Sequence, residues 1–191
     1  MIAFKKKYFL IIETIKDIDL RNIKNGYKFV IIYRSKQIKD SLTDIKRFRR
    51  NCNLKKIKLY VANNFKLCVL IRGDGIYLSS HNKSFKALNL LKSNFDIIGS
   101  AHNLSEISLK IKQGCNYILL SKLFFVNYDK SSSFLGLIKY NKYLKDIYKK
   151  LIPLGGINYK NLNKLKIINC DGFALLTEIK KNQNKIINRL F

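Results

Sequence analysis

The chain has 191 residues, 47% of them hydrophobic and 12% aromatic, which suffices for the core of about one domain and excludes both a wholly disordered chain and a large multidomain assembly. Lysine and arginine number 38 against 12 aspartates and glutamates, a formal net charge of +26. The longest apolar stretches, such as Tyr8–Ile12 and Phe29–Tyr33, are far too short to span a bilayer, so we expect a soluble cytoplasmic protein without a membrane partner.

The large positive charge has more than one explanation. Lysine abounds together with isoleucine, asparagine and tyrosine, while there is one proline and no tryptophan, a composition typical of a genome rich in A and T. The lysines are spread along the sequence, and no recognised nucleic-acid-binding motif accompanies them. We therefore expect mostly solvated surface charge, with small anionic metabolites as partners and nucleic acid as the minor alternative.

Four cysteines, Cys52, Cys68, Cys115 and Cys170, are scattered without a CxxC pair, and each lies in or beside an apolar run. Zinc sites and disulfide frameworks place cysteines at short, recurring spacings. We therefore expect these thiols to be reduced and buried in the core, in a reducing compartment.

Short runs of apolar, β-branched or aromatic residues recur along the chain, and amphipathic segments separate them. The runs predict eight strands, at Tyr8–Ile12, Phe29–Tyr33, Ile57–Ala62, Gly75–Leu78, Phe95–Ser100, Tyr117–Leu120, Leu151–Leu154 and Gly172–Leu176. The amphipathic segments predict helices at Ser41–Arg50, Ser84–Lys92, Leu104–Gln113, Leu137–Lys149 and Tyr159–Ile168. Between the first two strands, Thr14–Asn25 has only about the length of one helix, so the first unit is expected to be the weakest.

Continuous apolar strands that alternate with amphipathic helices are typical of a parallel sheet covered by helices, and eight such units close into a (β/α)8 barrel. We predict such an α/β TIM barrel as a single domain over residues 1–191, short for its class and trimmed near the N-terminus. A doubly wound open sheet is the alternative.

Function in such a barrel concentrates where the strands end, because the loops there line the barrel mouth. Polar residues and glycines follow the predicted strands at Arg34–Lys36, Asn63–Asn64, Ser79–Asn82, Ser100–Asn103, Ser121–Lys122, Gly155–Gly156 and Thr177. The sixth strand leads into a long loop with Asn127, Asp129 and Lys130, a length typical of a binding loop.

The pair Gly155-Gly156, with Asn158 as a helix N-cap, follows the seventh predicted strand. Glycines let main-chain N–H groups approach a phosphate, which a helix N-terminus also attracts, and the loops after strands seven and eight form a recurrent phosphate pocket in these barrels. We predict a phosphate site there, with an ordinary two-glycine turn as the alternative.

A characteristic order and spacing connects seven stretches: Asn63–Asn64, Arg72–Leu78, Ile98–Asn103, Gly114–Leu120, Leu135–Gly136, Pro153–Ile157 and Asp171–Ala174. In this order they resemble the thiamine phosphate synthase family, which also contains a thiazole tautomerase branch. The resemblance covers roughly Tyr27 to Ile179 and implies a (β/α)8 barrel of thiamine biosynthesis. Its synthases are transferases that join hydroxymethylpyrimidine pyrophosphate to thiazole phosphate and release pyrophosphate with the help of Mg²⁺.

The resemblance also implies roles for individual residues. Lys36 and Arg34 would hold pyrophosphate, Ser100 would contact it, and His102 would move protons on the thiazole, as in the tautomerase branch. Lys130 corresponds to a lysine of the flexible loop. Accordingly the implied catalytic residues are Lys36, Lys130 and His102, and the implied substrate-binding residues are Arg34, Asn63, Ser100, Gly155, Gly156 and Thr177.

The chain departs from the family at Asn64 and Asn82, the positions where synthases place magnesium-binding aspartates. Mg²⁺ prefers anionic oxygen ligands, so two amides are weak substitutes. Either pyrophosphate carries its own Mg²⁺ into a basic site, or the chain is a divergent or tautomerase-like member that binds thiazole phosphate without coupling it. A non-catalytic anion or nucleic-acid binder is a third alternative, and no oligomeric state is indicated.

Overall fold

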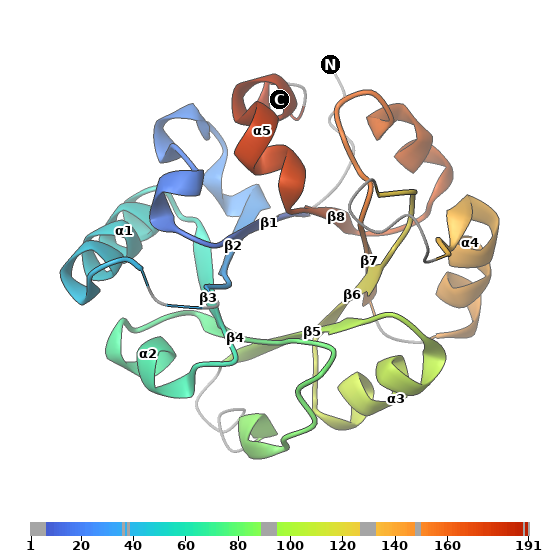
Figure 1. Ribbon diagram of the computed structural model, residues 1–191, viewed down its shortest axis with the longest axis horizontal. Helices are drawn as coiled ribbons and strands as arrows, with labels where there is room; N and C mark the ends of the chain where they lie inside the picture. The colour runs from blue at the N-terminus through green and yellow to red at the C-terminus, as the bar shows by residue number, and fades with distance from the viewer. Residues whose placement is uncertain are drawn as a thin grey trace.

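The computed structural model describes residues 7–35, 37, 39–88, 95–126, 133–147, 150–188 and 190. Eight parallel strands form one sheet in the order β7-β6-β5-β4-β3-β2-β1-β8. Their bounds are β1 Lys7–Ile12, β2 Phe29–Tyr33, β3 Lys58–Ala62, β4 Gly75–Leu78, β5 Asp96–Ala101, β6 Tyr117–Ser121, β7 Lys150–Leu154 and β8 Gly172–Leu175. Figure 1 shows the sheet rolled into a ring in which β8 comes round beside β7, with the helices outside. The predicted (β/α)8 barrel is confirmed.

The strands are apolar on both faces because each face meets other protein atoms. Along β1, Phe9 and Ile11 belong to the apolar cluster inside the barrel, whereas Tyr8, Leu10 and Ile12 belong to the layer between the sheet and the helices. A strand buried on both sides shows a continuous apolar run instead of strict alternation. This double burial is the physical reason that the sequence predicts the strands closely.

Five α-helices lie outside the ring in the part of the chain that the structure describes. Their bounds are α1 Leu42–Leu54, α2 Phe65–Leu70, α3 Leu104–Lys112, α4 Gly136–Asp146 and α5 Thr177–Ile187. Side-chain oxygens cap three of them, because Ser41, Asn64 and Asn103 accept hydrogen bonds from the first-turn N–H groups of α1, α2 and α3. Helices α2 and α5 are not among the predicted helices.

The first unit is trimmed, as predicted. Three short 3₁₀ turns, at Ile15–Asp17, Leu20–Asn22 and Gly26–Lys28, replace a helix between β1 and β2. Carboxylates hold two of these turns. Asp17 accepts hydrogen bonds from the main-chain N–H groups of Glu13 and Thr14. Asp19 accepts one from the main-chain N–H of Arg21. Local side-chain bonds of this kind compete with the helical ladder.

Two predicted helices are wrong in type or extent. The segment Tyr159–Ile168 forms a 3₁₀ helix at Leu162–Ile167. Asn158 and Asn161 bind nearby main-chain groups at this point, which favours turns over an α-helix. In the other segment only a short 3₁₀ turn at 86–88 is described, and residues 89–94 lie outside the described residues.

All four cysteine side chains are buried, which confirms their predicted place in the core. Burial raises the pKa of Cys52 to about 12 and that of Cys68 to about 11, so these thiols stay protonated and unreactive at neutral pH. Across the described residues, no helix combines the length and the apolarity needed to cross a membrane.

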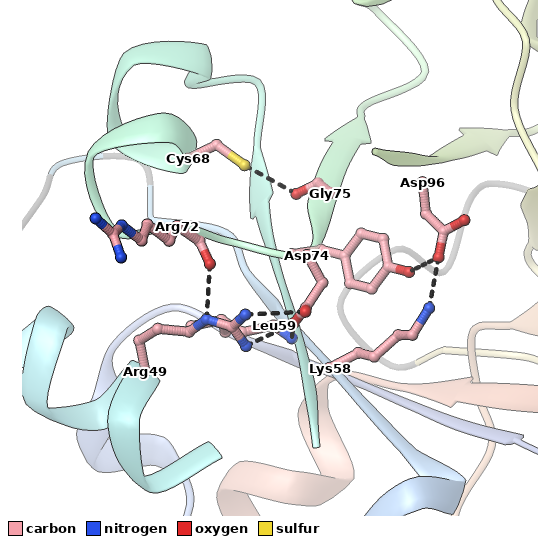
Figure 2. Close-up of polar contacts among 9 residues, drawn as sticks. Arg49, Lys58, Leu59, Cys68, Arg72, Asp74, Gly75 and Asp96 are labelled. Atoms are coloured by element: carbon pink, nitrogen blue, oxygen red, sulfur yellow. Dashed lines mark hydrogen bonds and ion pairs between the residues drawn. The ribbon is translucent and has the colours of Figure 1, made fainter. Parts of the chain in front are cut away.

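A buried ion pair ties helix α1 to the turn that precedes β4 (Figure 2). Arg49 donates from Nη1 and Nη2 to the two carboxylate oxygens of Asp74 at 2.6 and 2.9 Å, and from Nε to the Arg72 carbonyl at 2.9 Å. Asp74 also accepts the Leu59 N–H at 2.7 Å, which joins β3 to the same centre.

Replacing Arg49 by methionine is expected to destabilise the fold by about 2 kcal/mol, because it leaves the half-buried Asp74 carboxylate without its cation. Arg47→Met is the matched control, since Arg47 lies on the same helix with 72% of its side chain exposed, against 10% for Arg49. Its ion pair with Asp44 is long, at 3.8 Å. Thermal unfolding should show a loss of about 4–8 °C for Arg49→Met alone. Equal melting temperatures for the two variants would contradict this assignment.

Candidate active site

The carboxyl ends of the strands surround a cavity of about 690 Å³. This is the end of a (β/α)8 barrel at which active sites lie. The lining is mixed, with aromatic and aliphatic side chains beside polar and charged ones. It comprises Arg34, Tyr77, Ser79, Ser80, His81, Ser100, His102, Ser121, Phe125, Val126, Leu154, Gly155, Gly156, Ile157, Asn158, Ala174, Leu176, Thr177, Glu178 and Lys181.

The floor of the cavity carries a polar group inside the otherwise apolar barrel. Tyr77 points inward from β4 and is buried in the interior cluster. Burial raises the pKa of its hydroxyl, while the neighbouring Ser100 and the positive charge of Arg34 act in the opposite direction. The phenol is therefore neutral at physiological pH, and Arg34 and Ser100 lie close enough to it to act on its pKa.

His102 follows β5 at the rim, and its local bonds define which ring nitrogen is free. Its main-chain N–H donates to Glu106 Oε2 at 2.8 Å, and its Nδ1 lies 3.2 Å from the Ser121 carbonyl oxygen. A carbonyl only accepts, so Nδ1 donates in this contact, and in the neutral tautomer of the ring Nε2 carries the lone pair. His102 can therefore accept a proton from a ligand in the cavity.

The glycine turn after β7 has left-handed backbone at both positions, with φ of +91° at Gly155 and +70° at Gly156. The Gly155 carbonyl accepts the Phe124 N–H at 3.0 Å, and the Gly156 carbonyl accepts the Asn161 amide at 2.8 Å. Among the described residues, none accepts a hydrogen bond from the N–H of Gly155 or Gly156. Within the described part of the chain, these two N–H groups are therefore candidate donors for an anionic ligand at the cavity wall.

Packing alone also requires a glycine at one of these positions. A Cβ on Gly156 would lie 2.5 Å from the Phe125 carbonyl oxygen and 2.6 Å from that of Phe124, closer than any side chain tolerates. The glycine therefore permits a close approach of two loops whether or not a phosphate binds, and the phosphate site stays a prediction.

The N-terminus of α5 forms the neighbouring wall, with Thr177, Glu178 and Lys181 lining the cavity. Glu178 is buried, and its Oε1 accepts the Tyr159 N–H at 3.4 Å and the Asn182 amide at 3.2 Å. A helix N-terminus attracts anions, and here an internal carboxylate already lies in its first turn.

Three predicted site residues, Asn63, Asn64 and Asn82, lie at this end of the barrel but do not line the cavity. The Asn64 side chain accepts the Leu67 N–H at 2.9 Å as the cap of α2, and Asn82 Oδ1 accepts the Ser84 N–H at 2.9 Å. The side chain of Asn63 binds Ser79 and Asn82. All three amides thus serve the local structure.

The donor set does not fit a magnesium ion held by the protein. Asn64 and Asn82 offer neutral oxygens that are already engaged, whereas Mg²⁺ prefers carboxylates. Within the described ranges, no group of three His, Cys, Asp or Glu side chains could hold a metal ion.

The structure brings together Arg34, Ser100, His102, Gly155, Gly156 and Thr177 from the predicted set. Lys36 and Lys130 lie outside the described residues. Sequence reasoning did not assign roles to Tyr77, Glu178 and Lys181, which also line the cavity. The sequence pattern assigns Tyr77 to the core of its strand, and Glu178 and Lys181 lie within α5, a helix that was not predicted.

Comparisons with known proteins agree on one family. Residues 11–179 match the sequence profile described as "Thiamine monophosphate synthase". The chain is 29% identical over 162 residues to the thiamine-phosphate synthase of Flavobacterium johnsoniae, covering 81% of this chain and 76% of that protein. It is 28% identical to the thiamine-phosphate synthase of Prochlorococcus marinus subsp. pastoris, covering 82% of this chain but only 44% of that longer protein.

Solved structures share the fold. Thiamine phosphate pyrophosphorylase from Pyrococcus furiosus superposes with a TM-score of 0.74 at 17% identity, covering 100% of both chains. A 3-keto-L-gulonate-6-phosphate decarboxylase from Vibrio cholerae superposes with a TM-score of 0.66 at 13% identity, covering 98% of this chain and 100% of that one. At these identities the likeness concerns the barrel alone.

Proposed function

The chain belongs to the thiamine monophosphate synthase family, and we propose that it couples hydroxymethylpyrimidine pyrophosphate to thiazole phosphate. In this reaction the bond between the pyrimidine methylene carbon and the pyrophosphate oxygen breaks, and pyrophosphate leaves with the electron pair. The thiazole nitrogen then gives its lone pair to the methylene carbon. The protein has to position two anionic ligands and to neutralise the leaving group.

The observation that supports this proposal most is the meeting of Arg34 and Ser100 at Tyr77 on the cavity floor. Both are residues to which the family resemblance gives pyrophosphate contacts. The guanidinium would stabilise the charge that develops on the leaving oxygen, and the serine hydroxyl would donate a hydrogen bond to it. Lys36 and Lys130 would add further positive charge from their loops.

We also propose that thiazole phosphate lies at the turn of Gly155 and Gly156 and the N-terminus of α5 at Thr177. The N–H groups of the turn, from which no described residue accepts a hydrogen bond, and the helix dipole favour a phosphate at this wall. Mg²⁺ would reach the site as the counter-ion of pyrophosphate, since the protein residues do not fit a resident ion.

The Nδ1 contact of His102, which leaves Nε2 for a ligand, favours a second candidate, a tautomerase-like member that binds thiazole phosphate and moves a proton on the ring. Purified protein given both phosphorylated precursors and Mg²⁺ distinguishes the two. Formation of thiamine phosphate supports coupling. Binding of thiazole phosphate without any product across a range of Mg²⁺ concentrations would favour the tautomerase-like function.

Replacing Glu178 by glutamine is expected to tighten thiazole phosphate binding about fivefold. The amide can still accept the bonds from Tyr159 and Asn182, but it no longer repels a phosphate in the same cavity. Titration calorimetry at constant ionic strength measures the change, with Asp146→Asn on the exposed end of α4 as the control. An affinity that stays the same or falls would place the phosphate away from this wall.

A further inference from the structure

The loop after β4, residues 79–84, is hollowed on both sides. Ser79, Ser80 and His81 line the main cavity of about 690 Å³, and Ser80 and His81 also line a second cavity of about 600 Å³ that reaches α3. The position of a loop that lines two cavities depends on how its ends are anchored.

One anchor is the side chain of Asn63. Its Oδ1 accepts the Ser79 N–H at 3.1 Å and the Asn82 amide at 3.0 Å, and its Nδ2 donates to Ser79 Oγ at 3.1 Å. These bonds join the start of the loop to its middle, and Asn82 in turn binds the Ser84 N–H. Ser80 and His81 lie between the bonded positions.

The other anchor comes from α3 and the residue that follows it. Lys110 Nζ donates to the Asn82 carbonyl at 2.8 Å, and Gln113 Nε2 donates to the Asn82 and Ser84 carbonyls at 3.0 and 2.8 Å. Lys110 also donates to Gln113 Oε1 at 2.9 Å, which orients the amide. We name Lys110 and Gln113 the loop clamp.

Burying the polar side chains of the loop clamp costs free energy of folding, so stability alone does not explain their presence. Both side chains have 0% exposure, and the bonds of the Lys110 ammonium go to neutral oxygens. Burial lowers the pKa of Lys110, which expresses the cost of placing a charge there. A methionine would fill the same space without that cost. The advantage of a lysine at this position is therefore its hydrogen bonds to the Asn82 carbonyl and to Gln113 Oε1.

The barrel also leaves room for this side chain. A Cβ on Gly99 of β5 would lie 2.8 Å from Lys110 Cδ, so the glycine allows the lysine stem to pass over the strand. The aliphatic part of the Lys110 side chain therefore packs against β5, and its ammonium group contacts the loop.

We propose that Lys110 and Gln113 are positioning residues of the active site, which hold the loop 79–84 so that Ser80 and His81 contact the diphosphate of the pyrimidine substrate. The identity of that substrate rests on the proposed function. The imidazole of His81 and the hydroxyl of Ser80 supply hydrogen bonds to phosphate oxygens, and they do so only where the wall is fixed.

The test uses the two histidines of the chain, which give two imidazole NMR signals. Variants His81→Gln and His102→Gln assign them. Lys110→Met and Gln113→Leu each remove part of the loop clamp, and Lys145→Met on the exposed face of α4 is the matched lysine control. The readouts are the two imidazole signals, the affinity for inorganic pyrophosphate by calorimetry, the KM for each substrate and the melting temperature.

In Lys110→Met we expect the His81 signal to shift or broaden while the His102 signal stays, and pyrophosphate to bind at least tenfold more weakly. The KM for the diphosphate substrate should rise, with that for thiazole phosphate unchanged. Gln113→Leu should shift the same signal by less, and it carries the test if Lys110→Met fails to fold. A folded variant with the parental His81 signal and pyrophosphate affinity would overturn the proposal, even with a lower melting temperature.

The readouts separate the two proposals. If the parent forms no thiamine phosphate but His81 moves when the loop clamp is cut, the proposed function fails and the clamp stands. If the parent couples both substrates while the clamp variants keep the parental His81 signal and KM values, the clamp fails and the function stands.

Discussion

Gly156→Ala is expected to lower the stability of the protein by about 4 kcal/mol and to abolish thiazole phosphate binding. The first methyl carbon of any side chain there would lie 2.5–2.7 Å from main-chain atoms of Phe124 and Phe125, so one of the two loops has to move. The left-handed φ of +70° adds a cost of about 1–2 kcal/mol for a residue with a Cβ. Displacing the turn also moves the main chain of two residues that line the cavity.

Gly136 provides the matched control. Its φ is +69°, nearly that of Gly156, but a Cβ there would meet no atom within 4 Å. Gly136→Ala therefore bears the backbone cost alone, and the difference between the variants isolates the close approach of the loops. We expect a melting temperature about 8–16 °C lower for Gly156→Ala than for the parent, and a smaller loss for Gly136→Ala. Equal losses in the two variants would contradict the close approach of the loops, and parental phosphate affinity in Gly156→Ala would make Gly155-Gly156 an ordinary turn.

The strands were the most predictable part of the fold because burial on both faces leaves a strong local signal. The predicted bounds of Phe29–Tyr33 and Gly75–Leu78 match β2 and β4. Helix α2 left no such signal, since its six residues Phe65–Leu70 are short and almost wholly apolar. Length and periodicity identify a helix only where a polar face alternates with an apolar one.

The site was predictable where it depends on chain position and not where it depends on side-chain direction. Arg34, Ser100 and His102 follow strands of a barrel, so their place at one cavity follows from topology. Asn64 and Asn82 have similar positions, yet their amides turn to local N–H groups. Nothing in the sequence pattern distinguishes an amide that caps a turn from one that faces a ligand.

The loop clamp could not be predicted from the sequence either. Lys110 stands at a helical position within a strongly basic chain, where a lysine is expected on the surface. Only the fold shows that it lies over Gly99 and is buried beneath the loop after β4. In a chain with many surface lysines, the sequence alone therefore does not distinguish a buried lysine that binds a loop.

Replacing Arg34 by methionine is expected to slow thiamine phosphate formation by at least about 100-fold, or roughly 2.7 kcal/mol of transition-state stabilisation. Arg34 is the only arginine among the cavity-lining residues that the structure describes, and it lies near Tyr77 and Ser100. Methionine keeps the apolar stem but removes the charge that would meet the leaving pyrophosphate. Arg47→Met, an exposed arginine of α1, controls for the change in net charge.

Tyr77→Phe tests whether the tyrosine acts through this arginine. The ring still fills the barrel interior, so we expect the fold to persist and turnover to fall by about tenfold as the guanidinium loses the neighbouring hydroxyl. The double variant should then be little slower than Arg34→Met alone, because a hydroxyl that only positions Arg34 has no effect once that side chain is gone. Fully additive losses, measured as kcat/KM for the pyrimidine diphosphate, would mean that the phenol contacts the substrate itself.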